Sequence, residues 1–119
     1  MREVLRKHHI SFKSAITGLI WAFKTQPNFR VHLTLSVLAV AFGVSLGISR
    51  LEMVIIFFTI LLGLTAEMIN TSIESMTDLI TKEWRQEAKI AKDVAAGMML
   101  LTSIGAILVA VLIFWPYLF

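Results

Sequence analysis

The sequence predicts an all-α integral membrane protein, with an N-terminal amphipathic interfacial helix followed by three transmembrane helices. Three observations predict this class. Of the 119 residues, 57% are hydrophobic and only 16% are charged, whereas about a quarter of the residues in a soluble domain are charged. A soluble chain of this length could not bury so much apolar surface. The charges also gather in short groups that separate long uncharged stretches, as in membrane proteins.

Features that the chain lacks exclude several kinds of site. It has no cysteine, which excludes disulfides, thiolate zinc sites and iron–sulfur clusters. It has no glycine-rich phosphate loop and no Walker-type lysine motif, so the common soluble nucleotide-binding modes are excluded. The net charge of +3 is unevenly distributed, and this distribution favours a membrane surface over nucleic acid, which we do not expect as a partner.

Residues 10–25 predict a helix that lies in the cytoplasmic interface of the membrane. Apolar side chains recur at helical spacing along one stripe, and lysines lie off that stripe. Pro27 should end this helix before the first span begins. A cytosolic helix packed on a partner is the alternative interpretation. The stripe consists of Phe12, Ile16, Leu19, Ile20 and Phe23.

Three apolar stretches predict membrane spans at about 31–48, 53–72 and 94–115, because about 20 apolar residues cross a bilayer core. We therefore expect residues 1–119 to form one membrane domain. Ten Lys and Arg residues fall on one side of these spans and one on the other. The positive-inside rule then predicts a multi-pass protein of the cell membrane, with a cytoplasmic N-terminus and an external C-terminus.

Four polar residues of the second span share one helix face: Glu67, Asn70, Glu74 and Asp78. A carboxylate held in hydrocarbon costs about 2.5–3.5 kcal/mol, so Glu67 is expected to be paired or functional. Asp78 could be a solvated residue at a helix end, and Asn70 could join two helices through hydrogen bonds. Glu67 could also be a proton-relay carboxylate of a small transporter.

Two further polar clusters are predicted at the same depth, the cytoplasmic boundary. This arrangement suits a reaction between a water-soluble anion and a lipid headgroup. Lys92, Arg30 and Arg85 can hold phosphates, a pair of carboxylates can hold Mg²⁺, and a buried carboxylate can take a proton from an alcohol. The first cluster contains Gln26, Asn28, Arg30 and His32, and the second contains Lys89, Lys92 and Asp93.

Two segments resemble the signature of the prokaryotic diacylglycerol kinase family: residues 66–74 (AEMINTSIE), followed by Asp78, and residues 91–97 (AKDVAAG). Residues 28–32 (NFRVH) are similar to the branch of that family that phosphorylates undecaprenol. The resemblance covers nearly the whole chain. It implies a small homotrimeric membrane kinase that transfers the γ-phosphoryl group of ATP to a lipid alcohol, with active sites shared between neighbouring protomers.

The resemblance also implies roles for individual residues. Glu67 would be the general base, Asn70 would orient substrate or base, and Glu74 would hold Mg²⁺. We expect Glu67 and Arg30 to meet the lipid substrate. The residues expected to contact or border the nucleotide are Gln26, Glu74, Glu83, Trp84, Arg85, Lys92 and Asp93.

Gln26 departs from the family pattern, which usually has a second metal-binding glutamate at the end of the surface helix. An amide oxygen can bind Mg²⁺ but brings no charge, so we expect a weaker or rearranged metal site.

The leading hypothesis is an ATP-dependent lipid kinase, with undecaprenol favoured over diacylglycerol. The alternatives are a weakened regulatory member of the family and an oligomeric proton or cation transporter. A transporter needs polar residues through both leaflets. In the outer halves of these spans, the only residues without an apolar side chain are Ser, Thr and Gly.

Overall fold

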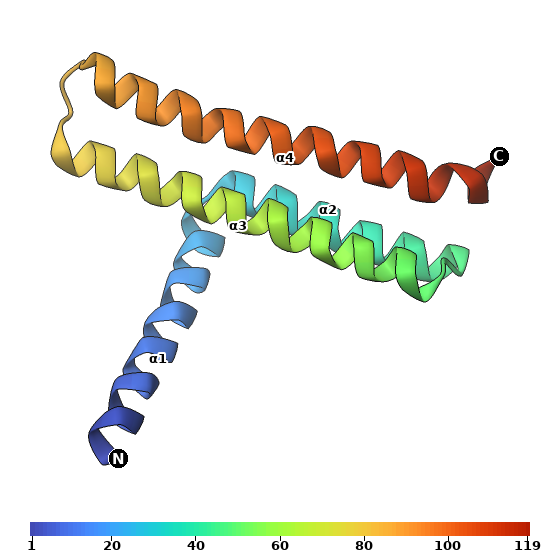
Figure 1. The fold of residues 1–119 in the computed structure, drawn as a ribbon, viewed down its shortest axis with the longest axis horizontal. Helices are drawn as coiled ribbons and strands as arrows, with labels where there is room; N and C mark the ends of the chain where they lie inside the picture. Colours follow the sequence, from blue (N-terminus) through green and yellow to red (C-terminus); the bar gives the residue numbers. More distant parts are fainter.

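The computed structural model describes residues 1–119 as four helices without strands: α1 (Arg2–Thr25), α2 (Pro27–Leu46), α3 (Arg50–Ile80) and α4 (Gln86–Leu118). The last three are long and apolar enough to cross a membrane. They run side by side, while α1 leaves the bundle at a steep angle (Figure 1). The predicted class, an all-α protein with one separate amphipathic helix and three candidate spans, is confirmed.

Helix α1 begins at Arg2 instead of near residue 10, because residues 2–9 contain neither glycine nor proline to interrupt it. The apolar stripe of this helix is uncovered: Phe12 is 71% exposed and Phe23 is 49% exposed. A helix set steeply against the bundle, with a bare apolar face, is suited to lying along a membrane surface.

The chain turns sharply between α1 and α2. Gln26 has an extended backbone, and Pro27 occupies the first position of α2, where its missing N–H removes no helical hydrogen bond. The guanidinium of Arg30 reaches back, and Nη1 donates to the carbonyl oxygens of Phe23 at 3.2 Å and Lys24 at 2.9 Å. These carbonyls belong to the last turn of α1, which has no further helical donors. Arg30 therefore fixes the end of α1 against the start of α2.

At the opposite end of the bundle, the turn between α2 and α3 is defined by local hydrogen bonds. Gly47 has a φ of 67°, a left-handed conformation that glycine adopts without strain. Ser49 and Glu52 form a capping box at the start of α3. The hydroxyl of Tyr117 donates to Oε2 of Glu52 at 2.7 Å, so the end of α4 is tied to this turn.

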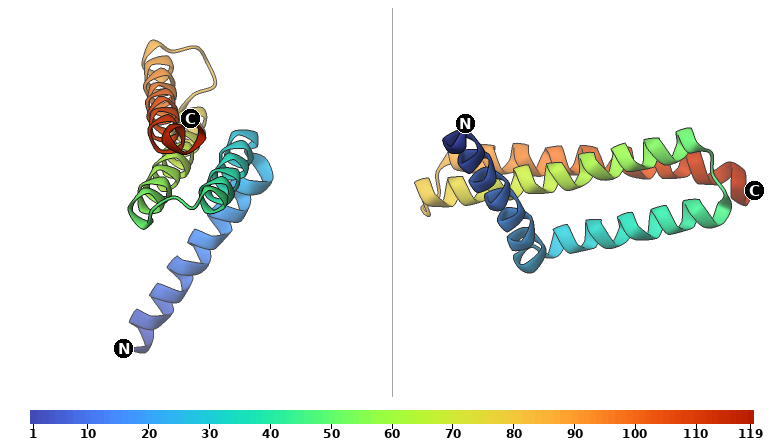
Figure 2. Two further views of the ribbon diagram at one scale, coloured as in Figure 1. Left: turned by 90° about the vertical axis from the view of Figure 1, so that its right-hand side faces the viewer. Right: turned by 90° about the horizontal axis from the view of Figure 1, so that it is seen from below.

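Helices α3 and α4 are longer than the predicted spans. With 31 and 33 residues, they measure about 46 and 50 Å at about 1.5 Å per residue, whereas the hydrocarbon core of a bilayer is about 30 Å thick. Both therefore extend beyond it, and residues 81–85 join them. Helices α2 and α4 both pack on α3, which the left panel of Figure 2 shows from one end of the bundle. We call the tip formed by the end of α3, residues 81–85 and the start of α4 the charged end.

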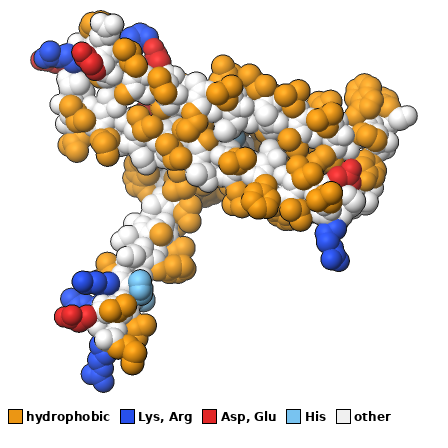
Figure 3. Space-filling model, viewed as in Figure 1, with side chains coloured by type: hydrophobic (Ala, Val, Ile, Leu, Met, Phe, Trp, Pro, Cys, Tyr) orange, Lys and Arg blue, Asp and Glu red, His pale blue; other side chains and the backbone are white.

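Few side chains are covered by the chain itself: 11 of 119 residues are buried. On the face shown in Figure 3, charged side chains gather at the ends of the bundle and on α1, and the sides between them are largely apolar. This is the inverse of a soluble protein, whose apolar groups are mostly inside. Lipid or further copies of the chain must cover these sides.

Candidate active site

Only the inner half of the polar face of α3 is turned into the bundle, because Glu74 and Asp78 are exposed. Glu67 is 3% exposed and Asn70 is 8% exposed, so both side chains are shielded by the chain's own helices. The carboxylate of Glu67 forms no ion pair and no side-chain hydrogen bond, whereas Asn70 and Glu74 bond to each other. A buried carboxylate without an internal partner is free to accept a hydrogen bond from a substrate hydroxyl.

Asn70 and Glu74 form a pair one helical turn apart. Nδ2 of Asn70 donates to Oε1 of Glu74 at 3.2 Å. The amide oxygen of Asn70 is fully enclosed and has no partner. Buried polar atoms are nearly always satisfied in native proteins, so this acceptor is available to a water molecule, an ion or a ligand.

At the charged end, an ion pair joins α3 to α4. Nζ of Lys92 donates to Oδ1 of Asp78 at 2.6 Å. Asp93, the other predicted nucleotide-binding residue of this helix, is exposed and pairs with Lys89 one turn earlier on α4. The structure therefore brings Lys92 onto the polar face of α3 and leaves Asp93 on the outer surface of α4.

Residues 81–85 form an open loop at the charged end. Trp84 is 76% exposed, and Nη2 of Arg85 lies 3.3 Å from Oε2 of Glu83. The backbone N–H of Glu83 donates to Oγ1 of Thr81, which orders the start of the loop. These three predicted nucleotide-binding residues lie together, but they form no bond to the Asn70–Glu74 pair.

Two residues near the start of α2, Gln26 and Arg30, form no bond to this site. Arg30 is held by the carbonyls of α1, as described above, and the amide of Gln26 donates to Oγ1 of Thr25 at 3.3 Å. Since α2 has 20 residues, it begins about level with residue 69 of α3, roughly 13 Å short of Asp78 at about 1.5 Å per residue. The start of α2 thus lies level with Glu67 and Asn70, as predicted, whereas Lys92 of the α4 cluster pairs with Asp78, about two and a half helical turns further along α3.

The donor set fits Mg²⁺. No group of three His, Cys, Asp or Glu residues gathers in the chain, so it contains no complete metal cage. Mg²⁺ is usually held by one or two carboxylates together with substrate phosphates and water. The carboxylate of Glu74 and the unpaired amide oxygen of Asn70 are oxygen ligands of this kind. Gln26 offers a second amide oxygen but forms no bond to either residue.

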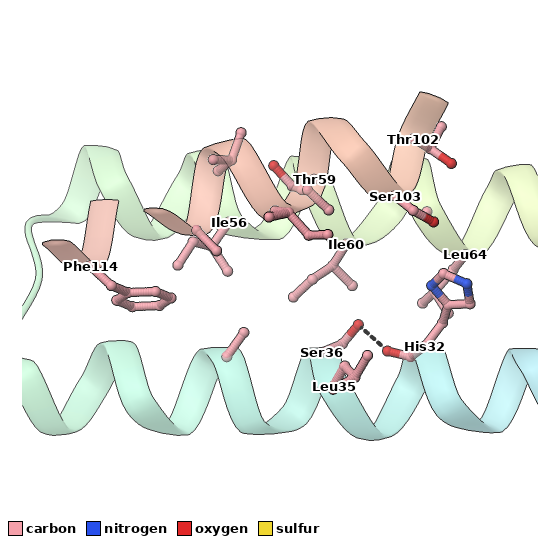
Figure 4. Close-up of a pocket in the computed structure, with 16 residues that line it drawn as sticks. His32, Leu35, Ser36, Ile56, Thr59, Ile60, Leu64, Thr102, Ser103 and Phe114 are labelled. Atoms are coloured by element: carbon pink, nitrogen blue, oxygen red, sulfur yellow. Dashed lines mark hydrogen bonds between the residues drawn. The ribbon is translucent and has the colours of Figure 1, made fainter. Parts of the chain in front are cut away.

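A cavity of about 380 Å³ lies between α2, α3 and α4. Figure 4 shows His32 at one end and Phe114 at the other, with apolar and hydroxyl-bearing side chains between them. The rings of Phe42 and Phe114, 5.0 Å apart, meet at the far end. Nδ1 of His32 lies 3.9 Å from the position of a Cβ on Gly63, one turn before Glu67, so the cavity leads toward the buried carboxylate.

Comparison with known proteins identifies the family to which the chain belongs. The sequence profile of the prokaryotic diacylglycerol kinases matches residues 13–114, which is most of the chain. The chain belongs to this family. The match includes the polar face of α3, both residues of the Asp78–Lys92 pair and the cavity walls.

Individual relatives agree with this assignment. The diacylglycerol kinase of Synechocystis is 37% identical over 84% of this chain, but this chain spans only 58% of that protein. The undecaprenol kinase of Bacillus subtilis is 33% identical over 97% of this chain and 94% of its own length. The diacylglycerol kinase of Escherichia coli K12 is 25% identical over 84% of this chain and 82% of its own.

Three features of this family member were missed by sequence reasoning. The cavity arises because α2 and α4 both pack on α3; the small residues Ala106 and Ala110 on its wall were a weak signal of close packing. Arg30 was expected at the substrate but caps α1. The pairing of Asp78 with Lys92 joins two predicted clusters that sequence spacing alone could not connect.

Proposed function

We propose that the chain is an ATP-dependent lipid kinase that transfers the γ-phosphoryl group of ATP to the hydroxyl of a lipid alcohol, with undecaprenol as the favoured acceptor. Family membership supports the reaction class. The nearly end-to-end match to an undecaprenol kinase, together with residues 28–32, favours undecaprenol over diacylglycerol. We also propose that the chain acts as a homotrimer, as the family resemblance implies; its bare apolar sides leave room for further copies.

The observation that carries this proposal is the buried, unpaired carboxylate of Glu67 one turn beyond the cavity. A lipid alcohol can rest its apolar chain among the helices and present its hydroxyl to Glu67. In the transfer, the acceptor oxygen forms a bond to Pγ while the bond from Pγ to the leaving oxygen of ADP breaks. The hydroxyl proton passes to Glu67, which acts as the general base.

The charged end supplies the remaining requirements of phosphoryl transfer, which are positioning and neutralisation of charge. Lys92 offers an ammonium group to the phosphates, and the loop of Glu83, Trp84 and Arg85 borders the nucleotide. Glu74 and the amide oxygen of Asn70 would hold Mg²⁺, with Gln26 as a further candidate. Mg²⁺ would neutralise the negative charge of the phosphates.

The distribution of basic residues supports a cytoplasmic N-terminus and an external C-terminus in the cell membrane. The charged end then faces the cytoplasm, where ATP is available. The lipid alcohol arrives laterally from the bilayer. Glu67 lies about 20 Å along α3 from Ile80, at about 1.5 Å per residue, between these two supplies.

A transporter is disfavoured by the residues that line the cavity. His32 is its only titratable lining residue, and its far end is lined by Phe114, whose ring packs on Phe42. A proton or cation path would require further polar groups through that half of the bundle.

Transfer from γ-labelled ATP by the purified protein in lipid vesicles tests the proposal. Undecaprenol and diacylglycerol are supplied at equal mole fraction, separately and in competition. We expect label in both lipids, with a higher kcat/KM for undecaprenol. Equal kcat/KM values would contradict the acceptor preference, and label in neither lipid would contradict the kinase.

A further inference from the structure

One carboxylate on the polar face of α3 has no part in the proposed reaction. Asp78 lies one turn beyond Glu74, on the same helix face. Its Oδ1 accepts a hydrogen bond from Nζ of Lys92 on α4 at 2.6 Å. Lys92 is the cation that the proposed function assigns to the nucleotide phosphates, so this contact determines where that cation is held.

The contact differs from the other ion pairs of the chain. Arg85 and Glu83 pair within the loop, and Lys89 pairs with a residue of its own helix. Only Lys92 and Asp78 join two helices. Their side chains are 41% and 53% exposed, so water and a soluble anion can reach the pair.

Fold stability does not account for this pair. Ion pairs exposed to solvent contribute little to stability, because water competes for both charges and two long side chains must be ordered. Helices α3 and α4 are already joined by residues 81–85 and pack along their lengths. A contact that contributes little to the fold is better explained by what it does to the lysine.

We propose that Asp78 is a positioning residue for Lys92. It holds the ammonium group over the polar face of α3, one turn from Glu74, where nucleotide phosphates are expected to bind. This inference rests on the proposed function. An unheld lysine has four flexible methylene groups and loses rotamer freedom when it binds phosphate. Ordering one such side chain reduces affinity by a factor of about 2 to 12.

The proposal predicts the direction of the effect on nucleotide affinity. If Asp78 positions Lys92, its removal leaves the ammonium disordered, and the KM for Mg-ATP rises. If Asp78 instead competed with phosphate for the ammonium, its removal would release Lys92, and the KM would fall.

The test uses Asp78→Ala, the conservative variant Asp78→Glu and the control Glu87→Ala, which removes an exposed, unpaired carboxylate from the first turn of α4. Steady-state kinetics at saturating lipid acceptor give kcat and KM for Mg-ATP, and thermal unfolding gives Tm. For Asp78→Ala we expect a KM raised about 2- to 12-fold with kcat and Tm little changed. Asp78→Glu should recover most of the wild-type KM, and Glu87→Ala should match the wild type.

A double-mutant comparison adds a second readout. In a Lys92→Ala background, Asp78→Ala should raise the KM no further, because both residues act through the same ammonium group. A KM that is unchanged or lowered in Asp78→Ala would overturn the positioning role. A loss of kcat and Tm at constant KM would also overturn it, because that is the signature of a structural residue.

Equilibrium binding of Mg-ATP in the absence of lipid distinguishes this inference from the proposed function. A wild-type protein that binds the nucleotide but transfers nothing contradicts the function. Asp78→Ala binding as tightly as the wild type contradicts the positioning role. A wild type that binds no nucleotide contradicts both.

Discussion

Replacing Asn70 with leucine should separate metal binding from stability. Leucine has the same number of side-chain heavy atoms as asparagine, with the same branching, but has no polar atoms. The substitution therefore removes the hydrogen bond from Nδ2 to Glu74 and, at the same time, removes the buried oxygen that lacks a partner. The two losses have opposite effects on the free energy of unfolding.

The magnitudes follow from these contacts. A hydrogen bond to a charged group contributes about 1.5–3 kcal/mol, and an unsatisfied buried polar atom costs about 1–3 kcal/mol. The two nearly cancel, so the free energy of unfolding should change by no more than about 1–2 kcal/mol. Loss of a group that orients a metal ligand costs about 10- to 100-fold in metal affinity or activity. Activity should therefore fall much more than stability.

The assay is a Mg²⁺ titration of lipid phosphorylation at fixed ATP, together with thermal unfolding. For Asn70→Leu we expect the half-saturating Mg²⁺ concentration to rise about 10- to 100-fold. The matched control is Thr71→Val, which replaces the next residue on the helix, also 8% exposed, and should leave the titration unchanged. An unaltered titration in Asn70→Leu, or an equal shift in Thr71→Val, would refute the reasoning.

Three other substitutions have definite expected outcomes. Gln26→Glu should raise activity or lower the Mg²⁺ requirement by adding a charge; an unchanged titration would show that Gln26 is not a ligand. Tyr117→Phe removes the hydrogen bond to Glu52 at the far end of the bundle, so it should lower Tm slightly and leave the KM for ATP unaltered. Gly47→Ala forces a side chain into a left-handed conformation and should destabilise the turn by about 1–2 kcal/mol, measured by unfolding; an equal or higher Tm would contradict this.

The fold class was predictable because it depends on properties that act locally. Segregated charge and long apolar stretches determine which segments can cross a bilayer. Proline cannot continue a helix, so the break between α1 and α2 was predictable from Pro27. The helical period also predicts that Glu67 and Asn70 share a face, and their burial shows that this face is turned inward.

The rest depends on contacts between segments, which helical periodicity does not contain. Tyr117 meets Glu52 across 65 positions of sequence, and Asp78 meets Lys92 on the next helix. Arg30 shows the same limit: its charge predicted an anion partner, but the nearest acceptors were the free carbonyls of α1. The unequal lengths of α2 and α3 also set the polar clusters at different levels.

The central claim is that Glu67 accepts the proton of a lipid alcohol during transfer from Mg-ATP. Single-turnover transfer of label from γ-labelled ATP to undecaprenol, by the wild type and by Glu67→Gln, tests this claim most directly. The account predicts that Glu67→Gln binds Mg-ATP normally but transfers label about 100- to 10,000-fold more slowly. Transfer at the wild-type rate by Glu67→Gln would contradict it.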